Sequence, residues 1–117
     1  MEVGHRKALL ERLVAYRLPI EPVLEGLSHF PFDSDEELVC IQREDVVSII
    51  DRFVAGNLTA EQVTDWADQV EVRDDLGVED NHREILRDAI FRLANPNLRD
   101  PITLEAVRAI RSKLVGG

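Results

Sequence analysis

Carboxylates dominate the side chains of this sequence that could do chemistry, and they are densest between Leu58 and Asp80. Arg73 is the only base from Glu61 to Asp80. Carboxylates at helical spacing can hold a divalent cation, act as general acid and base, or bind the basic groups of a partner. The candidates in this stretch are Glu61, Asp65, Asp68, Glu71, Asp74 and Asp75.

A calcium site is one interpretation of an earlier acidic run. Asp33, Asp35, Glu37 and Glu44 fall at positions 1, 3, 5 and 12 of an EF-hand loop. Position 6 of that loop must be glycine for its sharp turn, and here it is Leu38. We therefore interpret the run as a solvated acidic turn.

A magnesium-dependent hydrolase is a second alternative. Asp65 and Asp68 lie on adjacent turns of one expected helix, and Glu84 and Asp88 lie four residues apart on a later one. Four carboxylates from two helices hold magnesium in all-α nucleotide pyrophosphohydrolases, but the spacing here matches that pattern only in part. No set of lysines and arginines for a triphosphate accompanies it.

Other catalytic signatures are absent from the sequence. No two of the three histidines have metal-ligand spacing, and the single cysteine leaves no zinc pattern. The sequence also contains no glycine-rich phosphate loop and no nucleophile elbow. We therefore expect a non-enzymatic protein with no catalytic residues, no metal and no cofactor.

The charge is unevenly distributed along the chain. Residues 1–32 are neutral, residues 33–80 hold fifteen acids against three arginines, a net charge of −12, and residues 81–117 carry +3, which together give −9. A concentrated negative segment repels phosphate backbones, so we expect no direct binding of nucleic acid. A basic protein is the complementary partner, and a merely solubilising acidic face is the alternative.

Apolar periodicity predicts helices along most of the chain. The expected segments are 5–17, a short helix beginning near Pro22, 44–55, 60–72, one capped by Asn81 that ends before Asn95-Pro96, and one from Thr103 to the final glycines. The aromatics of Phe30-Pro31-Phe32 are expected to plug the core, and His82 to lie exposed in the first turn of its helix. The pattern indicates a single all-α domain over residues 1–117, a compact bundle of five to six helices.

The helix over 60–72 has the clearest start signal. Thr59 and Gln62 form a capping-box pattern. Trp66 lies within an apolar stripe with Val63 and Val70, so we expect it in the core. Arg73 would make a weak surface ion pair or, if buried against a carboxylate, would fix the turn after the helix.

A short extended segment is expected near 38–41, where Cys40 lies in an apolar run and is predicted to be a buried thiol. One cysteine and no secretory signal or membrane-length apolar run indicate a cytoplasmic protein that does not bind membranes. We expect a monomer or a weak dimer.

Several local patterns resemble small bacterial immunity proteins, the partners of bacteriocin and contact-dependent growth-inhibition toxins. The matching pieces are Phe53-x-x-Gly56-x-Leu58-Thr59, Trp66-Ala67, Arg73-Asp74-Asp75 and Leu93-Ala94-Asn95-Pro96, within residues 44–98. The resemblance implies a protein that neutralises a cognate toxin, here a basic nuclease domain, by covering its active site or substrate surface. The six acids of the opening paragraph would then mimic phosphates. An interaction or adaptor protein with no toxin partner is the alternative.

Overall fold

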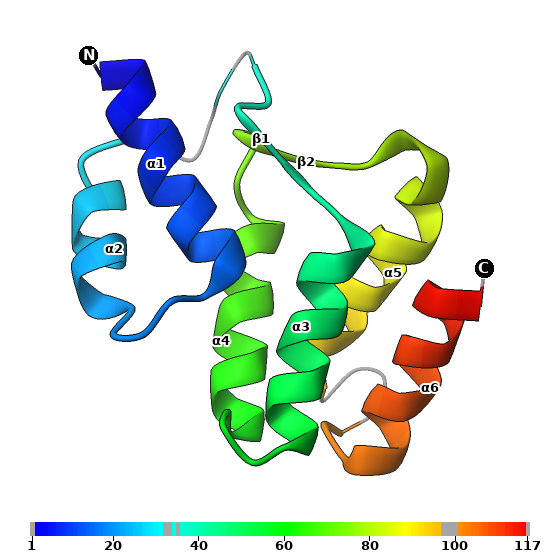
Figure 1. Ribbon diagram of the computed structural model, residues 1–117. Helices are drawn as coiled ribbons and strands as arrows, with labels where there is room; N and C mark the ends of the chain where they lie inside the picture. The colour runs from blue at the N-terminus through cyan, green and yellow to red at the C-terminus, as the bar shows by residue number, and fades with distance from the viewer. Residues whose placement is uncertain (1, 32–33, 35, 97–100, 117) are drawn as a thin grey trace.

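The computed structural model describes residues 2–31, 34, 36–96 and 101–116 (Figure 1). Its elements in chain order are α1 (Glu2–Ala15), α2 (Glu21–Leu27), β1 (Val39–Ile41), α3 (Arg43–Val54), α4 (Ala60–Glu71), β2 (Leu76–Val78), the 3₁₀ turn η1 (Asp80–His82), α5 (Arg83–Ala94) and α6 (Leu104–Gly116). The expected helical bundle with a short extended segment at 38–41 is confirmed.

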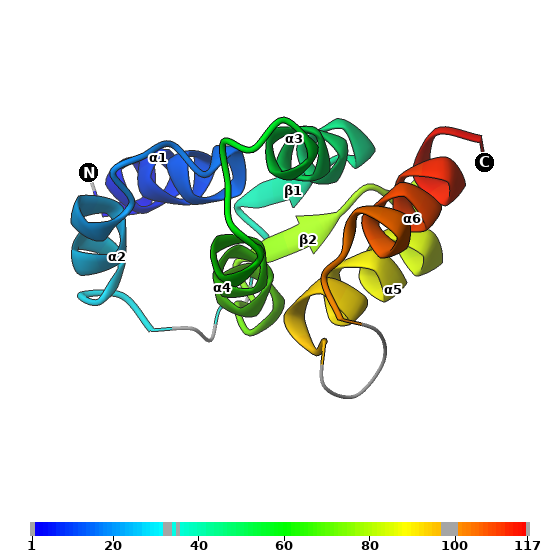
Figure 2. The ribbon, with the colours of Figure 1, turned by 90° about the horizontal axis from the view of Figure 1, so that it is seen from below.

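The helices pack against one another in pairs around one hydrophobic core. The most extensive helix contact joins α4 to α5, while α1 packs against α2 and α3 against α6. Both views place α1 and α2 at one end of the molecule and α6 at the other (Figures 1 and 2). Within the part of the chain that is described, no helix combines the length and apolar character needed to cross a membrane.

The first helix ends two residues before its predicted boundary. It was expected over residues 5–17, but the helix ends at Ala15 and Tyr16 takes a left-handed backbone with φ of 49°. Its apolar side chains Leu9, Leu10, Leu13 and Val14 are all buried.

The second strand, β2, lies between the helices expected at 60–72 and after Asn81, and it was not predicted. It pairs in parallel with β1, with Val39 opposite Leu76 and Ile41 opposite Val78. Three residues are too few to show a period, so only the partner strand makes this segment extended. A Cβ on Gly77, which lies between Leu76 and Val78, would come within 2.1 Å of Oε1 of Glu37, so the end of that exposed side chain would have to move.

Cys40 is exposed, so the prediction of a buried thiol was wrong. Alternate residues of a strand point to opposite faces, and here Ile41 takes the buried side. The pKa of the Cys40 thiol is nevertheless raised, first by partial burial and then by the nearby carboxylates of Glu37 and Asp80. A raised pKa lowers the thiolate fraction, and with it the reactivity of the thiol.

The start of α5 also differs from the prediction. Asn81 lies within η1 and does not cap a helix, and α5 begins at Arg83 without a side-chain cap. The side chain of His82 is only 19% exposed, and its Nδ1 lies 3.3 Å from Oε1 of Glu79. The same Glu79 oxygen accepts the Nε–H of Arg43 at 3.1 Å. This contact holds η1 and His82 against the start of α3.

Candidate partner-binding surface

The acidic helix α4 begins with the capping box that the sequence predicted. The Thr59 backbone N–H donates to Oε1 of Gln62 at 2.8 Å, and the Gln62 backbone N–H donates to Oγ1 of Thr59 at 3.1 Å. Gly56 has a φ of 86°, a conformation that suits glycine at the end of the preceding helix. Both ends of the link between α3 and α4 are therefore locally determined.

The inner face of α4 is held by Trp66, which is fully buried as expected. Its indole Nε1–H donates to the carbonyls of Leu13 and Val14, each at 3.1 Å. These carbonyls belong to the last turn of α1, where helix carbonyls lack partners within the helix. The Leu13 carbonyl also accepts the backbone N–H of Tyr16 at 2.9 Å. The tryptophan thus fills the core and adds a further donor at the end of α1.

Arg52 of α3 completes the same helix end. Its guanidinium donates to the carbonyls of Ala15 at 3.1 Å and Tyr16 at 3.0 Å, and it lies 5.9 Å from the centre of the Tyr16 ring. A cation at a helix C-terminus also suits the helix dipole. Side chains from α3 and α4 therefore fix α1 behind the acidic helix.

The outer face of α4 carries a row of exposed carboxylates. Glu61, Asp65, Asp68 and Glu71 are exposed along the helix, and Asp74 is exposed just beyond it. Ten residues separate Glu61 from Glu71, which is a helix length of about 15 Å. Within the described chain, none of Glu61, Asp65, Asp68 and Asp74 forms an ion pair. These four acids and Glu71 are called the α4 acidic row below.

Two groups at the acidic row, Glu71 and Tyr16, have a raised pKa. The pKa of Glu71 is raised by partial burial and then by repulsion from Asp68, while a hydrogen bond from the Asn95 side chain opposes the shift. Burial and then the charge of Asp65 raise the pKa of Tyr16. In both groups burial is the larger cause of the raised pKa, and the nearby carboxylate adds to it.

Asp75 is not part of this surface, although the sequence assigned it there. Its side chain has no exposed area. Nε of Arg73 donates to Oδ1 of Asp75 at 2.9 Å, Nη2 of Arg73 to Oδ2 at 3.0 Å, and Nε of Arg6 to Oδ2 at 2.9 Å. Both guanidinium groups also donate to the carbonyl of Pro31. Of the two alternatives for Arg73, the buried one is confirmed.

The cluster of Arg6, Arg73 and Asp75 joins segments that are distant in sequence. The backbone carbonyl of Asp75 accepts the N–H of Leu38 at 2.8 Å, which brings the chain before β1 alongside β2. Arg6 of α1 lies 5.6 Å from the centre of the half-buried Phe30 ring, which packs on the core as predicted. Phe32, the other aromatic of that motif, lies outside the described residues.

A sequence signal for the burial of Asp75 exists but is weak. Asp75 directly precedes the apolar run Leu76-Gly77-Val78, and Arg73 stands two residues before it. A carboxylate entering a buried strand needs a cation, and Arg73 is the only base nearby in sequence. The second cation, Arg6, comes from a helix 69 residues away and could not be found from local pattern.

The four carboxylates of the hydrolase alternative are not brought together. Asp65 lies near Tyr16, just after α1, and its charge raises the pKa of that side chain. Asp88 is instead paired with Arg92 at 2.8 Å and lines a cavity beside α6. Glu84 is exposed on α5. Among the described residues there is no group of three or more histidine, cysteine or acidic side chains that could hold a metal ion. Asp33 and Asp35 of the EF-hand pattern lie outside the described residues.

Comparisons with known proteins found no related family, protein or structure. No protein-family description matches the chain, and neither the curated proteins nor the solved structures contain a significant match.

Proposed function

We propose that this protein is an immunity protein that binds and neutralises a cognate, basic toxin domain of the nuclease class. The observation that carries the proposal is the α4 acidic row: exposed carboxylates, four of them without an ion pair in the described chain, on a helix fixed from behind by a buried tryptophan. Because the backbone of α4 is already held by the core, only the acidic side chains have to be ordered when they bind cations.

The proposed mechanism is mimicry of phosphates. A nuclease binds its substrate through lysine and arginine side chains, and the same side chains would pair with the acidic row. Opposite potentials accelerate encounter and make it sensitive to salt, because mobile ions screen exposed charges. The binding residues are Glu61, Asp65, Asp68, Glu71 and Asp74, with Asp75 removed because it is buried.

The resemblance to immunity proteins supports the proposed class of protein, but its motif residues do not identify the binding surface. Gly56 ends α3, Thr59 caps α4, Trp66 is core and Arg73 is a buried ion-pair partner. Each of these four motif residues therefore has a structural role. Specificity for a particular toxin must therefore come from the acids that lie between them.

The test uses the product of the gene directly upstream, which for an immunity protein should encode the toxin. Its C-terminal domain is purified, and its affinity for this protein and its nuclease activity are measured at low and high salt. We expect tight binding that inhibits the nuclease and weakens as salt is raised.

Two matched variants locate the surface. The double variant Asp65→Lys/Asp68→Lys should slow association at least tenfold at low salt, since a fixed cationic patch now faces a basic partner. The control Glu11→Lys/Glu84→Lys has the same net charge but alters exposed acids of α1 and α5. Equal association of the two variants would show that the toxin binds elsewhere. An upstream product that neither binds nor loses activity would reject the immunity function and favour an adaptor.

A further inference from the structure

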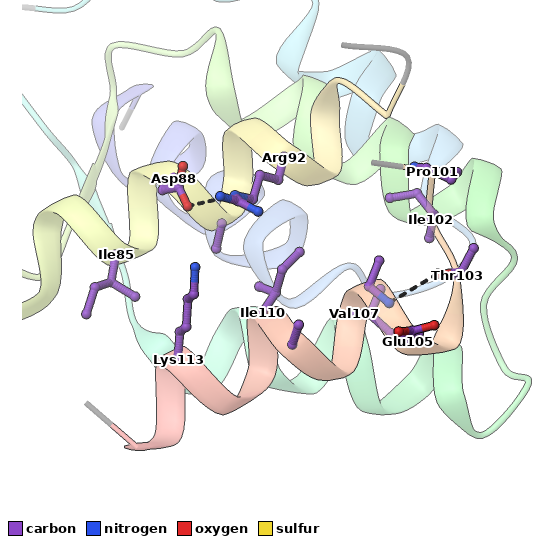
Figure 3. Close-up of a pocket in the computed structure, with 13 residues that line it drawn as sticks. Ile85, Asp88, Arg92, Pro101, Ile102, Thr103, Glu105, Val107, Ile110 and Lys113 are labelled. Atoms are coloured by element: carbon purple, nitrogen blue, oxygen red, sulfur yellow. Dashed lines mark hydrogen bonds and ion pairs between the residues drawn. The ribbon is translucent and has the colours of Figure 1, made fainter. Parts of the chain in front are cut away.

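A cavity of about 400 Å³ lies between α5 and α6, away from the acidic row (Figure 3). None of its lining residues belongs to α4. Volumes of roughly 300 to 1,000 Å³, apolar walls and a few polar groups are typical of small-molecule sites. The apolar part of the lining is formed by Ile85, Ala89, Ile102, Val107 and Ile110.

The charges in this cavity are unequally matched. Asp88 and Arg92 of α5 form an ion pair at 2.8 Å. Lys113 extends from α6 toward α5 with its ammonium end facing the cavity (Figure 3). It forms no ion pair within the described part of the chain. Glu105 lies near Thr103 at the opposite end of α6 (Figure 3), so Lys113, beside the ion pair of Asp88 and Arg92, adds a positive charge to its own end of the cavity.

The apolar wall runs between these two ends. Lys113 and Thr103 are ten residues apart along α6, a separation of about 15 Å. Ile110 and Val107 lie between them on the same helix and line the cavity, and Ile102 lies beyond. The cavity therefore presents Lys113, next to the ion pair of Asp88 and Arg92, and then an apolar wall. This arrangement is the complement of an amphiphile with an anionic head and an aliphatic chain.

We propose that this cavity binds a medium-chain aliphatic carboxylate, with the carboxylate on Nζ of Lys113 and the chain along Ile110, Val107 and Ile102. The head group would form a charge-assisted hydrogen bond, and burial of the chain and the isoleucines would supply the hydrophobic part of the affinity. An aliphatic amine of the same length would be repelled by Lys113, and the corresponding alcohol would lack the ionic contact.

The proposal is tested by titrating the whole protein with decanoate, decanol and decylamine, with binding measured by calorimetry and located by backbone amide NMR shifts. We expect decanoate to bind most tightly and to shift amides of α5 and α6. The sequence contains only two lysines, Lys7 and Lys113, so Lys7→Gln on α1 is a matched control for Lys113→Gln. Lys113→Gln should weaken decanoate binding about tenfold, and Lys7→Gln should leave it unchanged.

A second variant tests whether binding needs the space in the cavity, because it changes no charge. Ala106 lines the cavity from the first turn of α6, and Ala106→Met would fill space there without altering any charge. It should abolish binding of decanoate while the circular dichroism spectrum remains that of the parent. Equal affinity for the three ligands, an unaffected Lys113→Gln variant, or the absence of decanoate binding would each overturn the proposal.

Discussion

Asp74 and Asp75 are neighbours of the same residue type, yet they belong to different regions of the molecule. Asp74 is exposed beside the α4 acidic row, while Asp75 is fully buried between Arg73 and Arg6. The difference shows that a run of acids is not one functional unit. One carboxylate holds segments of the chain together, and its neighbour is free to meet a partner.

The largest expected effect comes from breaking the buried cluster. Asp75→Asn removes the buried carboxylate that Arg73 and Arg6 share and should lower the free energy of unfolding by about 3–5 kcal/mol. Asp74→Asn should change it by less than about 0.5 kcal/mol. Urea denaturation followed by circular dichroism measures both. Similar losses in the two variants would mean that Asp75 is not the buried member of the pair.

The next effect concerns Trp66, on the inner side of α4. Trp66→Phe removes the indole donor to the carbonyls of Leu13 and Val14 and leaves a small cavity, so stability should fall by about 2 kcal/mol. Val72→Ala, at an exposed apolar side chain just after α4, should have an effect within about 0.5 kcal/mol. Thermal denaturation of the two variants is the measurement, and a Trp66→Phe variant as stable as the parent would contradict the role of the indole N–H.

A smaller effect is expected at the start of α4, where the turn that carries Glu61 is capped. Thr59→Ala removes the hydroxyl that accepts the Gln62 N–H and should cost about 1 kcal/mol. Thr59→Ser keeps the hydroxyl and should retain most of that stability. Amide hydrogen exchange should show faster exchange in the first turn of α4 for the alanine variant, and identical exchange in both variants would argue against the cap.

The smallest effect lies in the acidic row and has the opposite sign. The pKa of Glu71 is raised above its usual 4.5 in the folded protein, so the native state binds this proton more tightly than the unfolded state does. Stability from this group is therefore present below about pH 4.5 and is lost as pH rises through the folded pKa. Glu71→Gln should then stabilise the protein slightly at neutral pH, by at most about 0.5 kcal/mol.

Urea denaturation across a pH series checks the sign of this effect. The advantage of Glu71→Gln should disappear in acid, where the parent is protonated. Asp68→Asn, which removes the repelling neighbour, should lower the pKa of Glu71 measured by NMR. A Glu71→Gln variant that is less stable at neutral pH than in acid, relative to the parent, would contradict the shift.

The sequence by itself determined the elements whose cause is local. The capping box at Thr59 and Gln62, the buried stripe of Val63, Trp66 and Val70, and the glycine at 56 each depend on residues within a few positions. Helical period and cap chemistry are properties of a short segment, and for this reason the helical fold and the burial of Trp66 were predicted correctly. The exposed position of four helix acids follows from the same period.

Tertiary structure alone decided where Asp75 lies, that residues 76–78 form a strand, and that Cys40 faces outward. Each depends on a contact across the fold: Arg6 with Asp75, β2 with β1, and Ile41 with the core. A three-residue strand and a buried charge have no local stabilisation of their own, because a strand needs a partner for its backbone and a buried carboxylate needs a cation. The chain must fold before either partner is in place.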